Sequence, residues 1–162
     1  MENSILLQAL KDKLGKSILS VDETADVLTV TVDSEVISTI IAFLKEKQDF
    51  IFLTDLCGIH YPEQEKELGI IYHLHNLVKN KRIRLKTFVT KANPKIQSIV
   101  SLFSGANWME RETFDFYGVE FVGHPNLVRI LNVEYMDYHP MRKEYPLEDA
   151  TRLDKDDSFF GR

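Results

Sequence analysis

The residues best suited to chemistry lie between positions 108 and 129, in the run WMERETFDFYGVEFVGHPNLVR. Among its aromatic residues stand four ionisable side chains: Glu110, Arg111, Glu112 and Asp115. Two carboxylates so close together could act as a general acid and a general base. On a helix, however, Arg111 would lie within reach of both Glu112 and Asp115. Because no nucleophile accompanies the carboxylates, we interpret the cluster as a charged network that fixes a protein interface in register.

A second cluster follows at positions 139–147, with the sequence HPMRKEYPL. Two X-Pro units extend the backbone on either side of a basic dipeptide. Arg142 can form a forked contact with a carboxylate, and Tyr145 can anchor a contact while its hydroxyl stays in water. We interpret this stretch as a point of contact with another protein. A surface loop whose charges are only solvated is the alternative.

Nucleotide binding finds little support in the sequence. The tetrapeptide LGKS at positions 14–17 resembles the end of a phosphate-binding loop, but that loop needs a glycine where Leu10 stands. The seven glycines are too dispersed for a dinucleotide-binding fingerprint. We therefore expect no bound nucleotide or flavin in this chain.

Histidines and basic residues alternate along two neighbouring segments. His73 and His75 would share one face of a strand, with His60 as a possible third metal ligand. We expect hydrogen-bonded histidines on a half-buried face and no metal. The next segment carries Arg82, Arg84 and Lys86. Their spacing predicts a solvated sheet face, with a docking stripe for an acidic partner as the alternative.

Composition limits the class of protein. The 162 residues are 44% hydrophobic and 28% charged, which is typical of one globular domain, and the net charge of −5 argues against a general nucleic-acid binder. The lone Cys57 cannot form a disulfide within the chain or hold a four-cysteine cluster. Neither a membrane span nor a secretory signal is visible. The chain reads as cytosolic or peripheral to a membrane.

The spacing of hydrophobic residues predicts the helices and strands that position the two clusters. It predicts helices over 3–14, from 33 or 34 to 47, from 94 to 103 and over 108–117. Strands are expected over 17–21, 27–32 and 50–59, the last buried on both faces. Segments 68–78 and 82–90 read as a hairpin around Asn80-Lys81.

The fold class that follows is α+β, with helices packed on a mostly antiparallel mixed sheet. Residues 1–121 form the expected compact domain. Residues 122–162 lack a sustained period but are rich in aromatic residues, so they read as an extended arm that lies on a partner.

The two clusters together resemble a known family. The run ERETFDFYGVEFVGHPNLVRIL, followed by HPMRKEYPL, looks like the C subunit of proton-translocating NADH–quinone oxidoreductase, respiratory complex I. The strand FIFLTDLCGIHYP is similar to a strand of the same family. With the clusters, the resemblance points to these interface residues: Glu110, Arg111, Glu112, Asp115, Tyr117, His124, Pro125, Arg129, Arg142, Lys143, Tyr145 and Pro146.

The resemblance implies a hydrophilic scaffold subunit with no catalytic residue, cofactor or metal of its own. The complex would use FMN, iron–sulfur clusters, NADH and a quinone. Its peripheral arm would lie at the cytoplasmic face of the bacterial inner membrane. There this chain would hold the quinone-site subunits, chiefly the D subunit and also the B subunit.

Two other functions stay open at this point. One is the equivalent subunit of a related membrane-bound hydrogenase or NDH-type complex. The other is a free-standing small enzyme with Glu112 and Asp115 as acid and base, which would need a pocket at those carboxylates.

Overall fold

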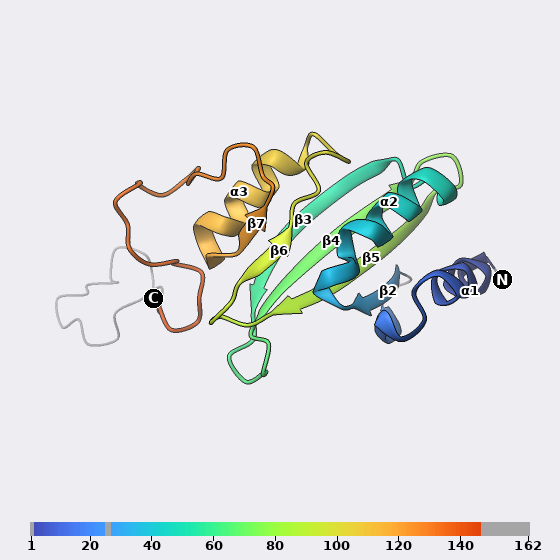
Figure 1. Cartoon of the computed structure of the whole chain (residues 1–162), viewed down its shortest axis with the longest axis horizontal. Coiled ribbons are helices and arrows are strands. Elements are labelled where there is room, and N and C mark those ends of the chain that lie inside the picture. Colours follow the sequence, from blue (N-terminus) through green and yellow to red (C-terminus); the bar gives the residue numbers. More distant parts are fainter. Residues whose placement is uncertain (1, 25–26, 147–162) are drawn as a thin grey trace, which may run out of the picture.

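The computed structural model describes residues 2–24 and 27–146, and these form an α+β fold around a five-stranded mixed sheet (Figure 1). Among these residues the helices are α1 (Glu2–Leu14), α2 (Ile37–Gln48) and α3 (Ala106–Tyr117). The strands are β1 (Ile18–Thr24), β2 (Val27–Val32), β3 (Phe52–His60), β4 (Leu68–Asn76), β5 (Lys81–Val89), β6 (Lys95–Gln97) and β7 (Glu120–Val122). The predicted fold class is confirmed.

The large sheet has the strand order β1-β2-β5-β4-β3. Only the β2–β5 pair is parallel, because the chain crosses over through α2 and the β3–β4 hairpin before it returns beside β2. Burial alternates along β5, where Ile83 and Leu85 face the core while Arg84 and Lys86 face the other side. Helix α2 lies across the sheet (Figure 1) and buries Ile37, Ile40, Ile41 and Leu44.

The hairpin between β4 and β5 forms where the sequence predicts it. Asn76 pairs with Lys81, and Asn80 adopts a left-handed conformation with φ 49°. Asparagine tolerates this conformation better than most residues, which explains how the turn closes without glycine. The predicted helices at the N-terminus and over 108–117 are also confirmed.

Two sequence predictions about the secondary structure are wrong. Strand β3 is an edge strand whose Phe52 is exposed while Leu53 and Leu56 are buried, so it is not buried on both faces. The helix expected from Pro94 is replaced by β6, which pairs in parallel with β7, and by a series of turns. Here the Ser98 N–H donates to the Val122 carbonyl, so a tertiary hydrogen bond takes the place of a helical one.

The opposite ends of the sheet carry different elements. Helix α3 and the chain after β7 lie at one end, and α1 lies at the other (Figure 1). No helix within the described part of the chain is long and apolar enough to cross a membrane.

Candidate interface between helix α3 and the C-terminal segment

Helix α3 holds the chain that follows it in a fixed path. We call residues 123–146 the C-terminal segment; it contains no helix or strand. The segment returns over α3, and most of its hydrogen bonds to the helix converge on Asp115. Asp115 is fully buried, so the segment seals this carboxylate from water.

The Asp115 carboxylate accepts five hydrogen bonds. Oδ1 accepts from Arg129 Nη1 at 2.7 Å and from Asn132 Nδ2 at 3.1 Å. Oδ2 accepts from three consecutive backbone N–H groups, those of Ile130, Leu131 and Asn132, at 3.1, 2.8 and 2.9 Å. Such a run of N–H groups forms a concave site for an anion.

These donors decide the charge of Asp115. Burial opposes ionisation, but the N–H groups of Asn132 and Leu131 and the side chains of Arg129 and Asn132 outweigh it, and the pKa of Asp115 lies well below its usual value. Asp115 is therefore an anion held in the interior. With every acceptor site occupied and no access to solvent, it cannot take a proton from a substrate.

Arg129 extends the same network along the segment. Besides the carboxylate, its Nη1 reaches the Asp115 carbonyl at 2.9 Å, and its Nη2 donates to the carbonyls of Met136 and Tyr138 at 2.7 and 2.9 Å. His139 Nδ1 also lies 3.0 Å from the Asp115 carbonyl oxygen. Asp115 and Arg129 together thus hold the chain at points from position 129 to position 139.

The predicted pairing of Arg111 with Glu112 and Asp115 is wrong. Arg111 donates to the backbone carbonyls of Val128 and Arg129, at 3.1 and 3.0 Å. The helix spacing alone gave no information about the C-terminal segment. Donors from that segment form the hydrogen bonds that the buried Asp115 carboxylate needs. Arg111 still secures the segment, although it does so through main-chain oxygens.

Glu110 anchors the other side of α3. It is fully buried and accepts hydrogen bonds from Ser98 Oγ and the Ile99 N–H, both at 2.7 Å. Burial raises the pKa of Glu110, and the two hydrogen bonds offset only part of that effect. Glu110 therefore ties the turn after β6 to α3.

Glu112 lies apart from both networks. It lines a cavity of about 210 Å³ with Asp55, Cys57 and Tyr117. Burial, followed by the negative charges of Asp55 and Glu112, raises the pKa of the Cys57 thiol to about 11. The thiol is protonated at neutral pH and is a poor nucleophile.

The end of α3 leaves room for the second sequence cluster. Gly118 has φ 74°, and a Cβ atom there would lie 2.5 Å from His139 Nε2 and 2.6 Å from Arg142 Nη2. Arg142 Nε donates to the Tyr117 carbonyl at 2.8 Å, and the Met141 N–H donates to the Phe116 carbonyl. The left-handed conformation favours glycine here, and a Cβ atom would force the ends of the His139 and Arg142 side chains to shift.

The remaining predicted interface residues are spread along the segment. His124 Nε2 lies 3.1 Å from the Asn107 carbonyl oxygen, and its Nδ1 accepts from the Asn126 N–H. Tyr145 packs on Tyr138 with ring centroids 4.9 Å apart. Pro125 and Pro146 are exposed.

Two residues that the sequence patterns did not assign to this site take part in it. His60, at the end of β3, accepts a hydrogen bond from the Lys143 N–H at 2.9 Å, and Asn132 contacts Asp115, as does His139 of the second cluster. The Asn132 and His60 contacts have no local signal because their partners lie 17 and 83 positions away.

His73 and His75 are hydrogen-bonded within the sheet. Arg84 Nε donates to His73 Nε2 at 2.7 Å, and His75 Nε2 lies 3.2 Å from Asn80 Oδ1. In residues 2–24 and 27–146, no group of three or more His, Cys, Asp or Glu side chains is arranged to hold a metal ion.

Comparison with protein families gives a match to "Respiratory-chain NADH dehydrogenase, 30 Kd subunit" over residues 30–151. The C subunit of NADH-quinone oxidoreductase from Citrifermentans bemidjiense is 36% identical over 151 residues, which are 93% of this chain and 94% of that protein. The C subunit from Geobacter sulfurreducens is 38% identical, over 93% of this chain and 94% of its own length.

Two solved structures share the fold. One is described as "Nqo5 of the trypsin-resistant fragment (1-134) in P63 form"; its TM-score is 0.67 at 25% identity, and the match covers 75% of this chain and 98% of that one. The other is a chain of the membrane-bound sulfane sulfur reductase, an archaeal respiratory membrane complex. Its TM-score is 0.77 at 20% identity, over 96% and 97% of the two chains.

Replacing Asp115 by asparagine will release the C-terminal segment. The amide cannot accept from all the donors that now face the carboxylate, and Arg129 loses its partner, so the docked state should lose about 3–5 kcal/mol. Limited trypsin digestion should cut the segment of Asp115→Asn much faster than that of the wild type. Asp137→Asn, an exposed acid in the same segment, is the control and should leave digestion unchanged.

Low pH will remove the stabilisation that the ionised Asp115 carboxylate gives to the folded chain. Because the pKa of Asp115 is lower in the folded than in the unfolded chain, where it is about 3.9, its contribution is complete above that pH and is lost as the pH falls through the folded pKa. The difference in unfolding free energy between wild type and Asp115→Asn should therefore be constant from neutral pH to about pH 5 and shrink below about pH 4. A difference that already shrinks near neutral pH would contradict this assignment.

Proposed function

Because the chain belongs to the family of the 30 kDa subunit of respiratory-chain NADH dehydrogenase, we propose that it is a non-redox scaffold subunit of complex I. In this role it holds the subunits that form the quinone site in place while other subunits carry electrons from NADH to the quinone. We propose the D subunit as the chief partner and the B subunit as a further one.

The observation that carries this proposal is the surface of the C-terminal segment. Tyr135 is 88% exposed and Leu131 is 67% exposed, although the backbone that bears them is fixed by Asp115 and Arg129. Large apolar side chains on a rigid, exposed backbone are typical of a protein interface that is preorganised for its partner. Trp108 of α3 is also largely exposed and adds to the apolar area at this end of the molecule.

The chemistry of the complex is assigned to its other subunits. FMN, the iron–sulfur clusters, NADH and the quinone would be bound outside this chain, which contains a single cysteine. We propose that the complex places it at the cytoplasmic face of the bacterial inner membrane. The equivalent subunit of a related membrane complex is the second candidate, since a chain of the sulfane sulfur reductase shares the fold.

We also propose that residues 1–121 fold without the arm, residues 122–162. All the buried core residues lie before residue 122, and the described part of the arm is joined to α3 by hydrogen bonds such as those of Arg129 and Arg142. The Nqo5 structure is that of a trypsin-resistant fragment of its protein, which supports a stable unit in this part of the fold.

Truncation after Val122 tests this division. The shortened chain should give one cooperative unfolding transition in urea, because its apolar core is intact and the exposed Asp115 can be hydrated. In cells that lack the full-length chain, it should not assemble into the complex. A truncated chain that is unfolded, or one that assembles at the normal yield, would refute the division.

The interface itself is tested by two surface substitutions. In the double variant Leu131→Ser/Tyr135→Ser, loss of the exposed apolar side chains should reduce assembled complex and NADH–quinone activity several-fold, while the isolated chain keeps its stability. Leu19→Ser, on the edge strand β1, removes an equally apolar side chain that is 59% exposed and serves as the control. Normal assembly of the double variant would show that these side chains do not contact a partner.

A further inference from the structure

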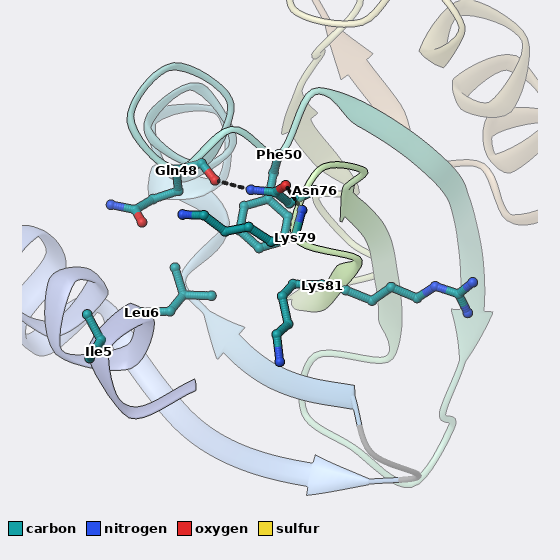
Figure 2. A pocket seen from close by; sticks show the side chains of 8 residues that line it. Ile5, Leu6, Gln48, Phe50, Asn76, Lys79 and Lys81 are labelled. Carbon is teal, nitrogen blue, oxygen red and sulfur yellow. Dashed lines mark hydrogen bonds between the residues drawn. The ribbon is translucent and has the colours of Figure 1, made fainter. Parts of the chain in front are cut away.

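The end of the sheet opposite α3 contains a cavity of about 270 Å³. It lies between α1 and the turn that joins β4 to β5. Figure 2 shows the side chains of Leu6, Phe50, Lys79 and Lys81 around it. None of these side chains takes part in the network around Asp115, so the cavity is separate from the interface proposed above.

Apolar side chains form much of the cavity and continue outside it. Ile5 and Leu6 come from α1, and Phe50 comes from the chain just before β3. In the β4–β5 turn, which contributes Lys79 to the cavity, Val78 is 88% exposed and Leu77 is 52% exposed. The strand register places exposed Phe52 next to this turn, since Phe52 pairs with His75 at the end of β4.

The charged groups that line the cavity are all cationic. Lys79 and Arg82 line it together with Lys81, which has an interaction of its own, and none of the described lining residues is acidic. This local excess of positive charge occurs in a chain whose net charge is −5. An occupant with negative charge is therefore favoured, and a basic one is repelled.

Of the two uncharged polar side chains that line the cavity, Asn76 is used within the protein. Asn76 Nδ2 donates to the Gln48 carbonyl at 2.9 Å, and Asn76 Oδ1 accepts from the Lys79 N–H at 2.9 Å (Figure 2 shows the first of these). The amide of Asn76 thus serves to tie α2 to the β4–β5 turn. The cavity selects its occupant by apolar shape and by charge.

The volume limits what can enter. Sites for cofactors and drug-sized ligands usually measure about 300–1,000 Å³ and enclose most of the ligand. At about 270 Å³ this cavity lies just below that range, and it has room for one large apolar side chain whose backbone stays at the surface. The cationic rim then meets acidic residues that flank that side chain.

We infer that this end of the chain is a second docking surface, which binds an acidic segment of a neighbouring subunit and takes one of its large apolar side chains into the cavity. The inference rests on the proposed function, because the neighbour is sought within the same complex. It adds a partner contact at the end of the sheet away from α3.

Photo-crosslinking in the assembled complex tests this inference. A photoreactive phenylalanine derivative is placed at Val78, and the same group at Glu65, in the exposed β3–β4 loop, is the control. After purification and irradiation, mass spectrometry should map the Val78 adduct to another subunit, within a few residues of Asp or Glu and a large apolar side chain. The Glu65 position should not give this adduct.

The cationic rim is tested with matched charge reversals. Lys79→Glu/Arg82→Glu should lower the yield of the Val78 adduct about tenfold or more, because like charges now face the acidic segment. Lys16→Glu/Lys66→Glu changes the net charge equally at exposed positions away from the cavity and should leave the yield unchanged.

The possible results separate the two proposals. If the chain is absent from the purified complex, the proposed function fails. If it is present but Val78 gives no adduct, or links only to a basic segment, to lipid, to a second copy or to residues 147–162 of its own chain, the docking surface is refuted while the proposed function stands.

Discussion

The buried Asp115 carboxylate is the constraint on which this end of the molecule depends. A charge that is removed from water stays ionised only when enough donors surround it. Here all five donors come from residues 129–132, which lack regular secondary structure. The anion therefore fixes the backbone of the C-terminal segment, as a ladder of hydrogen bonds fixes the backbone of a strand. It specifies one path and fixes the apolar side chains that the segment presents to solvent.

Helix α3 can do this because its two buried acids face different environments. Glu110 has two donors, and burial raises its pKa, whereas Asp115 has five donors and a lowered pKa. The first acid fastens the helix to the turn after β6, and the second fastens the segment to the helix. Gly118 ends the helix with φ 74° and leaves the space that His139 and Arg142 occupy. The twelve residues of α3 thus connect the hydrophobic core to the exposed surface of the C-terminal segment.

The sequence predicts this arrangement only in part. Periodicity identified the mixed sheet, the hairpin at Asn80 and helix α3, because these depend on local spacing and turn chemistry. It failed at 94–103, where Ile99 donates to Glu110 instead of to a helical carbonyl. Asp115 does take part in a buried charged network, but its partner is Arg129, 14 positions away, and not Arg111. Helix spacing tells which side chains a few positions apart can reach one another. It gives no information on a segment that returns from farther along the chain.

The proposed scaffold role also explains why an irregular segment is anchored so firmly. A disordered arm would have to be ordered when its partner binds, and that ordering takes part of the interaction free energy. In this chain the backbone that bears Leu131 and Tyr135 is already fixed by Asp115, so more of the contact energy is available for binding. A second contact at the other end of the sheet would then act on an already positioned subunit. Two modest surfaces on one rigid body can hold a neighbour more tightly than either surface alone, provided that both are engaged together.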